Sequence, residues 1–208
     1  MKRLLRIGLT AALAALAACS GLNLAPTQAE RYLVLTAPSS SITSAPAPAR
    51  APRREAALLL APTTAPAFYD TQEIVFSKSP GTRGLYQFSH WTEPPSARVF
   101  NLLAARLQAA GSFRSVASTN SGVRGRWLLR TQIEEIYHDA SSSPGTARLL
   151  LTAELSEPDK RVLLARRSFG AAVPAASFDA DGAAQALRVA LGQVLDELTV
   201  WVDAAAVD

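Results

Sequence analysis

The chain has 208 residues, of which 49% are hydrophobic and 18% charged, so it can bury a core and is not a disordered chain. Its one cysteine excludes an internal disulfide framework and a cysteine-cluster metal site. The formal net charge is +4, but residues 1–18 hold three of the 21 basic residues and no acidic one. The rest of the chain therefore has 18 basic and 17 acidic residues. Such a nearly neutral body gives no electrostatic reason to expect nucleic-acid binding.

The first segment of the chain is typical of a signal peptide. Three basic residues, Lys2, Arg3 and Arg6, precede an uncharged run at 7–17 that is rich in leucine and alanine. An eleven-residue helix rises about 16 Å, well short of the roughly 30 Å hydrocarbon core of a bilayer. We therefore expect residues 1–18 to direct export and to be removed afterwards.

The residues at the cleavage point carry a second signal. Residues 16–19 read Leu-Ala-Ala-Cys and resemble the bacterial lipobox, in which the cysteine thiol receives a diacylglycerol and the new amine is acylated after cleavage. The resemblance implies lipid attachment at Cys19. Several acyl chains at that residue would hold the protein on a membrane stably. The alternative is a buried cysteine beside an ordinary cleavage site. Ser20 is not aspartate, which by the same resemblance implies sorting to the outer membrane.

The remaining chain is expected to hold a lipidated tether at 19–29 and one domain at 30–208. A stretch at 37–54 is rich in proline, alanine, serine and threonine, which is typical of an extended linker or a long loop. Short runs rich in β-branched and aromatic residues predict strands elsewhere. They lie at 31–35, 56–60, 72–77, 84–91, 113–118, 126–137, 146–157 and 161–173.

Two amphipathic helices are predicted among these strands. The first begins at the Pro94-Pro95 pair and ends at Gly111, and the second begins after Asp179, a good N-cap residue. The last three strands are joined by Ser-Pro-Gly and Pro-Asp-Lys turns, which favour antiparallel hairpins. The expected fold class is α+β, a mostly antiparallel sheet with both helices packed on one face.

Motifs of catalysis and metal binding are not found in the sequence. It has no nucleophile elbow, no His-Glu-x-x-His zinc motif and no phosphate-binding Gly-Lys-Ser/Thr motif. The two histidines, His90 and His138, have no nucleophile fixed beside them in sequence. The acidic pair at 134–135 and the His-Asp pair at 138–139 divide between the two faces of a strand, so we expect a solvated strand end, no metal and no cofactor. The Gly-Val-Arg-Gly segment at 122–125 is expected to be a turn.

The densest aromatic and rigid patch is a candidate contact surface. It contains Tyr86, His90, Trp91, Pro94 and Pro95. Tyrosine and tryptophan are frequent anchors of protein interfaces. The alternative is that these residues form part of the core and the start of a helix.

Several of these features together resemble the family of ABC-type transport auxiliary lipoproteins, the paraquat-inducible lipoprotein group. The order and spacing of the features carry the resemblance over nearly the whole mature chain, and the long linker at 37–54 departs from it. The features are Cys19, Tyr32-Leu33-Val34-Leu35, the apolar run before Pro62, Tyr69-Asp70 before Ile74-Val75, Leu85-Tyr86 before His90-Trp91-Thr92-Glu93-Pro94-Pro95, and Trp201 in the last helix.

The resemblance implies a role without catalysis. Family members partner with a mammalian-cell-entry (MCE) domain protein and with an ABC permease and ATPase in the inner membrane. These systems move lipids or similar apolar molecules between the two membranes. The lipoprotein is then expected at the outer membrane, on its periplasmic side, held by the acyl chains on Cys19.

Three further possibilities follow from the residues. Residues 71–130 carry a net charge of +6 and residues 131–208 carry −6, so opposed patches could support self-association into a ring; the alternative is that these charges intermix on folding. A second reading of function is a stand-alone periplasmic lipoprotein that binds an envelope polymer or a small apolar ligand. Its sign would be an apolar pocket lined by residues such as Leu149 and Leu151. A hydrolase is a third interpretation, which needs a serine or aspartate beside His90 or His138.

Overall fold

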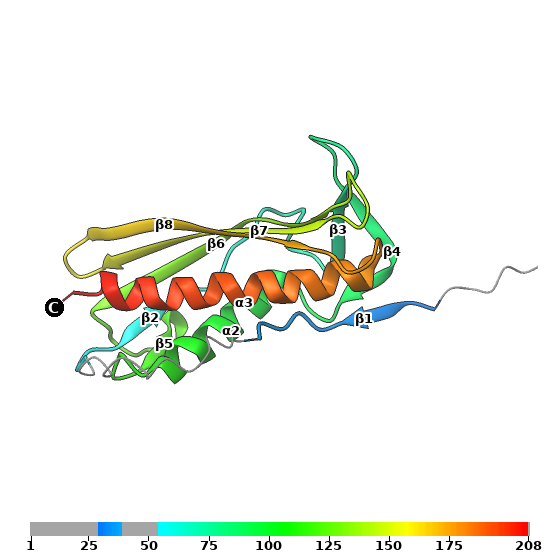
Figure 1. The fold of residues 1–208 in the computed structure, drawn as a ribbon. Coiled ribbons are helices and arrows are strands. Elements are labelled where there is room, and N and C mark those ends of the chain that lie inside the picture. Colours follow the sequence, from blue (N-terminus) through cyan, green and yellow to red (C-terminus); the bar gives the residue numbers. More distant parts are fainter. Residues whose placement is uncertain (1–28, 39–53, 208) are drawn as a thin grey trace, which may run out of the picture.

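The structure, a computed structural model, describes residues 29–38 and 54–207. They form an α+β fold in which one mixed sheet of eight strands packs against two helices (Figure 1). The expected signal, the tether up to residue 28, Cys19 and most of the linker lie outside the described residues. No helix within the described part is long and apolar enough to cross a membrane.

Three long strands make one side of the sheet, and the last of them forms its edge. Strands β6 (Trp127–Asp139), β7 (Thr146–Glu157) and β8 (Val162–Pro174) form an antiparallel meander, as their turn residues predict. Apolar side chains that face α3 meet in register, with Ile133 opposite Leu151 and Leu151 opposite Phe169. All three are buried in the core.

The remaining strands make the sheet mixed, which corrects the expectation of a mostly antiparallel one. Strand β3 (Glu73–Ser77) is antiparallel to β4 (Gly84–Trp91) but parallel to β6. Strand β1 (Arg31–Leu33) is parallel to β4. Strand β2 (Leu58–Leu60) lies between β5 (Val116–Ser118) and β6 and is parallel to both. Each parallel pairing joins segments distant in sequence, so no local turn residue announces it.

Both helices begin, and the first one ends, where the sequence places their signals. Helix α2 (Pro95–Ala110) has Pro95 as its first residue and ends at Gly111, whose φ of 71° suits glycine. Helix α3 (Ala180–Ala205) is capped by Asp179, whose carboxylate accepts a hydrogen bond of 2.8 Å from the Gly182 amide.

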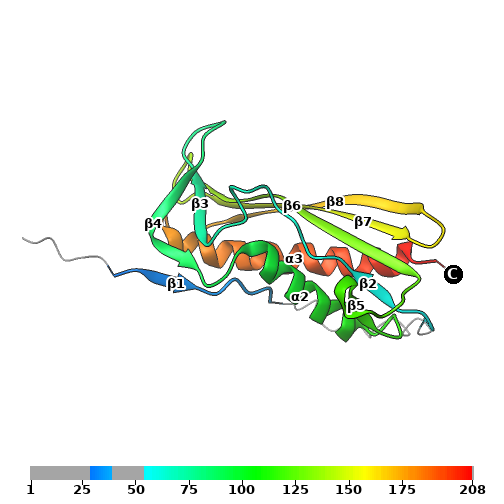
Figure 2. The same cartoon turned by 180° about the vertical axis from the view of Figure 1, so that it is seen from behind.

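Both helices cover the same face of the sheet, as expected (Figures 1 and 2). The inner side of α3 buries apolar residues at helical spacing, which pack against β7 and β8. They include Leu187, Leu191, Val194, Leu195 and Leu198. Helix α2 lies beside α3, so the sheet and the two helices share one hydrophobic core.

Candidate functional site

Residues 31–38, named here the N-terminal strap, lie along α3. At the strap's first residue, Arg31 forms an ion pair of 2.6 Å with Asp181 in the first turn of α3. Further along, Arg188 donates a 2.8 Å hydrogen bond to the carbonyl of Val34. The strap therefore follows the helix from its start, and Figure 2 shows it passing beneath α3 toward α2.

Helix α2 holds the strap from the other side. The Arg98 guanidinium donates a 2.7 Å hydrogen bond to the carbonyl of Leu35, whose side chain is buried in the core. Arg106 donates a hydrogen bond of 2.7 Å to the carbonyl of Ala37 and forms an ion pair with Asp196 of α3. In a sheet, a neighbouring strand donates hydrogen bonds to the backbone carbonyls of an extended segment. For these carbonyls of the strap, the arginine side chains are the donors instead.

A glycine lets the end of the strap reach α3. A Cβ atom built at Gly192 would lie 2.3 Å from the carbonyl oxygen of Pro38, which is closer than real Cβ contacts come. The helix surface is therefore flat at the point where the strap crosses it.

Arg54 fixes the far end of α3. Its guanidinium forms an ion pair of 2.6 Å with Asp203 and donates a 2.7 Å hydrogen bond to the carbonyl of Ala206. It also lies 5.2 Å from the ring centroid of Phe113. At 1.5 Å per residue, the 26 residues of α3 span about 39 Å. The strap therefore begins at one end of the body, and residue 54 lies at the other.

The fold divides the predicted aromatic patch between surface and core. The His90 ring contacts the exposed ring of Tyr32 at 5.5 Å between centroids, whereas the half-buried Tyr86 bonds the buried His138. Trp91 lies on the other side of β4 from His90 and is 2% exposed. Pro94 precedes α2 and Pro95 is a buried residue of its first turn. Only part of the patch is therefore available to a partner in this conformation.

His138 is buried, so the expectation of a solvated end for this strand is wrong at that residue. Its Nδ1 atom lies 2.7 Å from the hydroxyl of Tyr86 and its Nε2 atom 3.0 Å from the carbonyl oxygen of Pro144. Since a carbonyl only accepts, Nε2 carries the proton and Nδ1 accepts from Tyr86. Burial, with a smaller contribution from the charge of Asp179, raises the pKa of Tyr86 to about 12.

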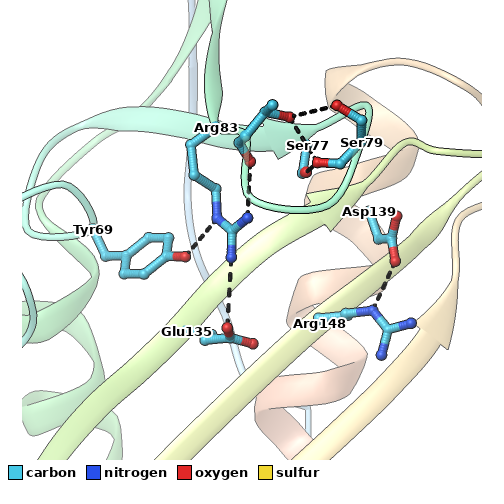
Figure 3. Close-up of polar contacts among 8 residues, drawn as sticks. Tyr69, Ser77, Ser79, Arg83, Glu135, Asp139 and Arg148 are labelled. Carbon is cyan, nitrogen blue, oxygen red and sulfur yellow. Dashed lines mark hydrogen bonds and ion pairs between the residues drawn. The ribbon is translucent and has the colours of Figure 1, made fainter.

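Two acidic residues of the same strand, β6, form ion pairs with neighbouring arginines. Arg83 donates a 2.7 Å hydrogen bond to Tyr69 and approaches Glu135 at 3.5 Å (Figure 3). Its guanidinium also lies over the ring of Tyr137 at 4.1 Å. Asp139 accepts hydrogen bonds from Ser141 and from Arg148, which lower the pKa of its carboxyl. No group of three potential metal ligands is found within residues 29–38 and 54–207.

The charges of the two sequence halves intermix in the folded chain. Among the basic residues of the first half, Arg83, Arg106 and Arg126 form ion pairs with acidic residues of the second half. Separate positive and negative halves therefore do not exist on this surface. The charge distribution therefore does not support the expected self-association into a ring.

An open groove that sequence reasoning missed lies at the end of the body near residue 54. Its largest hollow has a volume of about 770 Å³ and is lined by residues 55–57, 114–115 and 123–126 and by the turn between β7 and β8. A hollow of about 410 Å³ adjoins it at Glu157, and a third of about 240 Å³ follows at Arg130 and Glu154. We call these three hollows together the distal groove. Its lining comes from segments that are distant in sequence, and one of them, the Gly-Val-Arg-Gly segment, was expected only to be a turn.

The apolar pocket expected for a small ligand is not formed by the predicted residues. Leu149 and Leu151 are both part of the hydrophobic core. Nothing in the described part of the chain points to catalysis: His138 is bound by Tyr86 and Pro144, and the buried Nε2 atom of His90 has no hydrogen-bond partner among the described residues.

The structure is thus an α+β body whose N-terminal segment is bound along its longest helix. The chain belongs to the family of ABC-type transport auxiliary lipoprotein components, whose model matches residues 36–199. The family is one of membrane-associated lipoproteins of the cell envelope, and its role is auxiliary to an ABC-type transporter.

Solved structures show the same fold. Protein XCC0632 from Xanthomonas campestris, of the family DUF330, is 26% identical, with a TM-score of 0.72 over 84% of this chain and 95% of that one. A second structure, of an uncharacterised protein, is 15% identical, with a TM-score of 0.64 over 84% of this chain and 99% of that one. No curated protein sequence matches the chain.

Proposed function

We propose that the protein is an outer-membrane lipoprotein facing the periplasm, and a non-catalytic docking subunit of an MCE/ABC-type system that moves lipids between membranes. Its partners in this proposal are an MCE-domain protein and an ABC permease with its ATPase. The family match supports the auxiliary transport role. The lipobox at residues 16–19 and Ser20 support the lipid anchor and the outer membrane.

The N-terminal strap is the observation that carries the proposal. A chain held on a membrane by its first residue transmits every pull through the segment that follows the tether. Here that segment is bound by Arg98 and Arg106 from α2 and by Arg188 from α3. Pulling on the tether therefore loads both helices and the core instead of peeling away one strand.

The strap also orients the body on the membrane. Nine residues separate Cys19 from the first described residue, so a membrane holding Cys19 would lie on the side of the strap's beginning. Tyr86 and His90, with the exposed Tyr32, lie at that end, because β1 pairs with β4 there. We propose this surface, underlain by Trp91 and Pro95, as a contact with a neighbouring copy or another envelope component.

The anchor is tested by following a tagged Cys19→Ser protein in cell fractions. The expected result is loss of the protein from the membrane fraction and loss of transport function. A matched control is Ser20→Asp, which keeps the acylated cysteine and is expected to shift the protein from the outer to the inner membrane. Unchanged fractionation of the Cys19→Ser protein and normal function would refute the anchor.

The partner is tested with the acylated protein purified in detergent and with purified MCE-domain proteins of the same cells. Saturable binding to one of them is the expected result. If none binds, the MCE-system assignment fails, whatever the outcome for the anchor.

A further inference from the structure

The distal groove has a position that separates it from the membrane side of the body. Arg31 binds Asp181 at the start of α3, whereas residues 54–57 and the groove lie beside the last turn of that helix, near Asp203. The two ends are about 39 Å apart along α3. Figure 1 shows β2, β5 and the β7–β8 turn at the end of the molecule that also carries the C-terminus. In the proposed orientation this end faces away from the anchoring membrane.

The shape of the groove suits an extended chain rather than a compact ligand. Its three hollows adjoin one another, because Glu157 lines the first two and Arg130 lines the last two. They run from the Gly-Val-Arg-Gly loop past the β7–β8 turn and onto the outer face of the sheet. A small ligand would need a closed, mostly apolar cavity.

The charges in the groove leave basic groups without partners. Arg124, Arg130 and Arg161 line it, and none of the three forms an ion pair with another described residue. The lining of the three hollows holds seven basic and four acidic residues, Glu55 and Asp159 among the acidic ones. Glu157 is bound by Arg126 at 2.7 Å and by Lys160 at 2.8 Å. Glu154 is paired with Arg166 in the same way at 3.4 Å. The groove therefore presents a positive field to an incoming chain.

Exposed aliphatic side chains lie among these arginines. Val123 is 45% exposed, Val162 46% and Leu163 56%, and all three line the groove. Arginines beside exposed aliphatic groups favour a ligand that has both carboxylates and apolar side chains. A lipid headgroup or a free phosphate would leave the aliphatic groups uncovered.

We propose that the distal groove is a docking surface for an extended, acidic and partly apolar segment of a protein partner. The proposal rests on the proposed function for the partner's identity, the MCE-domain protein. The arginines attract and orient the acidic segment, and the aliphatic side chains are covered when it is seated. The groove gives the lipoprotein a second contact at the end opposite its lipid.

The experiment measures binding of the acylated protein, purified in detergent, to the purified MCE-domain protein. Arg124→Glu and Arg130→Glu each reverse one exposed charge in the groove and are each expected to weaken binding about tenfold, and added salt should weaken wild-type binding more than binding of the variants. The control is Lys78→Glu, the same change of charge on an exposed residue of the β3–β4 turn at the other end, and it should bind like wild type. Circular dichroism of each variant checks that the fold is kept.

A photo-crosslinking amino acid in living cells locates the contact independently. At Val123 or Leu163 it should give a crosslink to the MCE-domain protein, and at Val200, which is 70% exposed on α3, it should give none.

The outcomes separate the two proposals. If wild type does not bind the MCE-domain protein, the proposed function fails. If wild type binds and both groove variants bind equally well, the docking site is elsewhere and only this inference is overturned. Crosslinks from Val123 to a second copy of this chain, or binding of anionic phospholipid vesicles that Arg124→Glu abolishes, would assign the groove to another occupant and also overturn it.

Discussion

The guanidinium of Arg106 on α2 forms an ion pair with the carboxylate of Asp196 on α3, and the same group donates hydrogen bonds to the carbonyls of Ala37 and Gly192. One side chain therefore joins the two helices to the strap. The side chain of Arg106 is 14% exposed and that of Asp196 26%. A shielded pair of this kind matters most when one partner is removed, because the other is left uncompensated.

Replacing Arg106 by alanine should therefore destabilise the protein by about 2 kcal/mol, because a carboxylate and two carbonyls lose their donor. The measurement is urea unfolding followed by circular dichroism. The control is Arg167→Ala, which removes a 4.0 Å pair with Glu197 whose side chains are more than half exposed, and it should change stability by less than about 0.5 kcal/mol. Equal effects of the two substitutions would contradict the role given to Arg106.

The contact between strap and helix gives a second prediction. Gly192→Ala places a methyl group against the Pro38 carbonyl, so the strap must move away from α3. We expect a loss of about 1–3 kcal/mol and faster hydrogen exchange of the strap's amides. Gly170→Ala is the matched control, because its added Cβ would meet its nearest atom at an ordinary 3.5 Å. Unchanged exchange in the strap of Gly192→Ala would show that the contact is not tight.

The sequence was informative where structure depends on neighbouring residues. The strands at 126–137, 146–157 and 161–173 have alternating patterns and turn residues between them, and the structure forms them within two residues of those bounds. Asp179 and Gly111 likewise mark true helix ends. Each of these signals acts within a few residues of its effect.

Features that join distant segments could not be predicted in the same way. The pairing of β2 with β5 and β6 brings Leu58 beside Val116 and Trp127, and no pattern in any of the three segments names its partner. The burial of His138 depends on Tyr86 in another strand. The distal groove is built from segments between residues 55 and 166, so its arginines appeared in the sequence only as dispersed charges.

The N-cap of α3 gives a third prediction, in which the loss of stability depends on which residue replaces Asp179. The Gly182 amide, and then the Ser177 hydroxyl, lower the pKa of the Asp179 carboxyl. Asp179→Ala should cost about 1 kcal/mol at neutral pH, whereas Asp179→Asn keeps an oxygen acceptor and should cost less. Thermal unfolding compares them.

The pH dependence of this cap follows from the lowered pKa. A carboxyl whose pKa is lower in the folded state stabilises the fold above its unfolded pKa, near 3.8, and that contribution is lost as the pH falls through the folded value. The gap in stability between wild type and Asp179→Ala should therefore narrow as the pH falls below about 4. A gap that stays constant down to pH 2 would mean that the charged form of Asp179 makes no special contribution.

The hydrogen bond between Tyr86 and His138 gives the last prediction, at alkaline pH. Below pH 10, Tyr86→Phe should cost about 1–2 kcal/mol, because the buried Nδ1 atom of His138 loses its donor. The pKa of Tyr86 is raised to about 12 in the folded state, so between pH 10 and 12 the unfolded chain gives up the phenol proton while the folded chain keeps it. The native state then binds more protons than the unfolded state, and the stability contributed by the neutral phenol is lost as the pH rises through that interval. The difference between wild type and Tyr86→Phe in urea unfolding should narrow from pH 9 to pH 12, and a difference that widens over this range would contradict the assignment of a buried, neutral tyrosine.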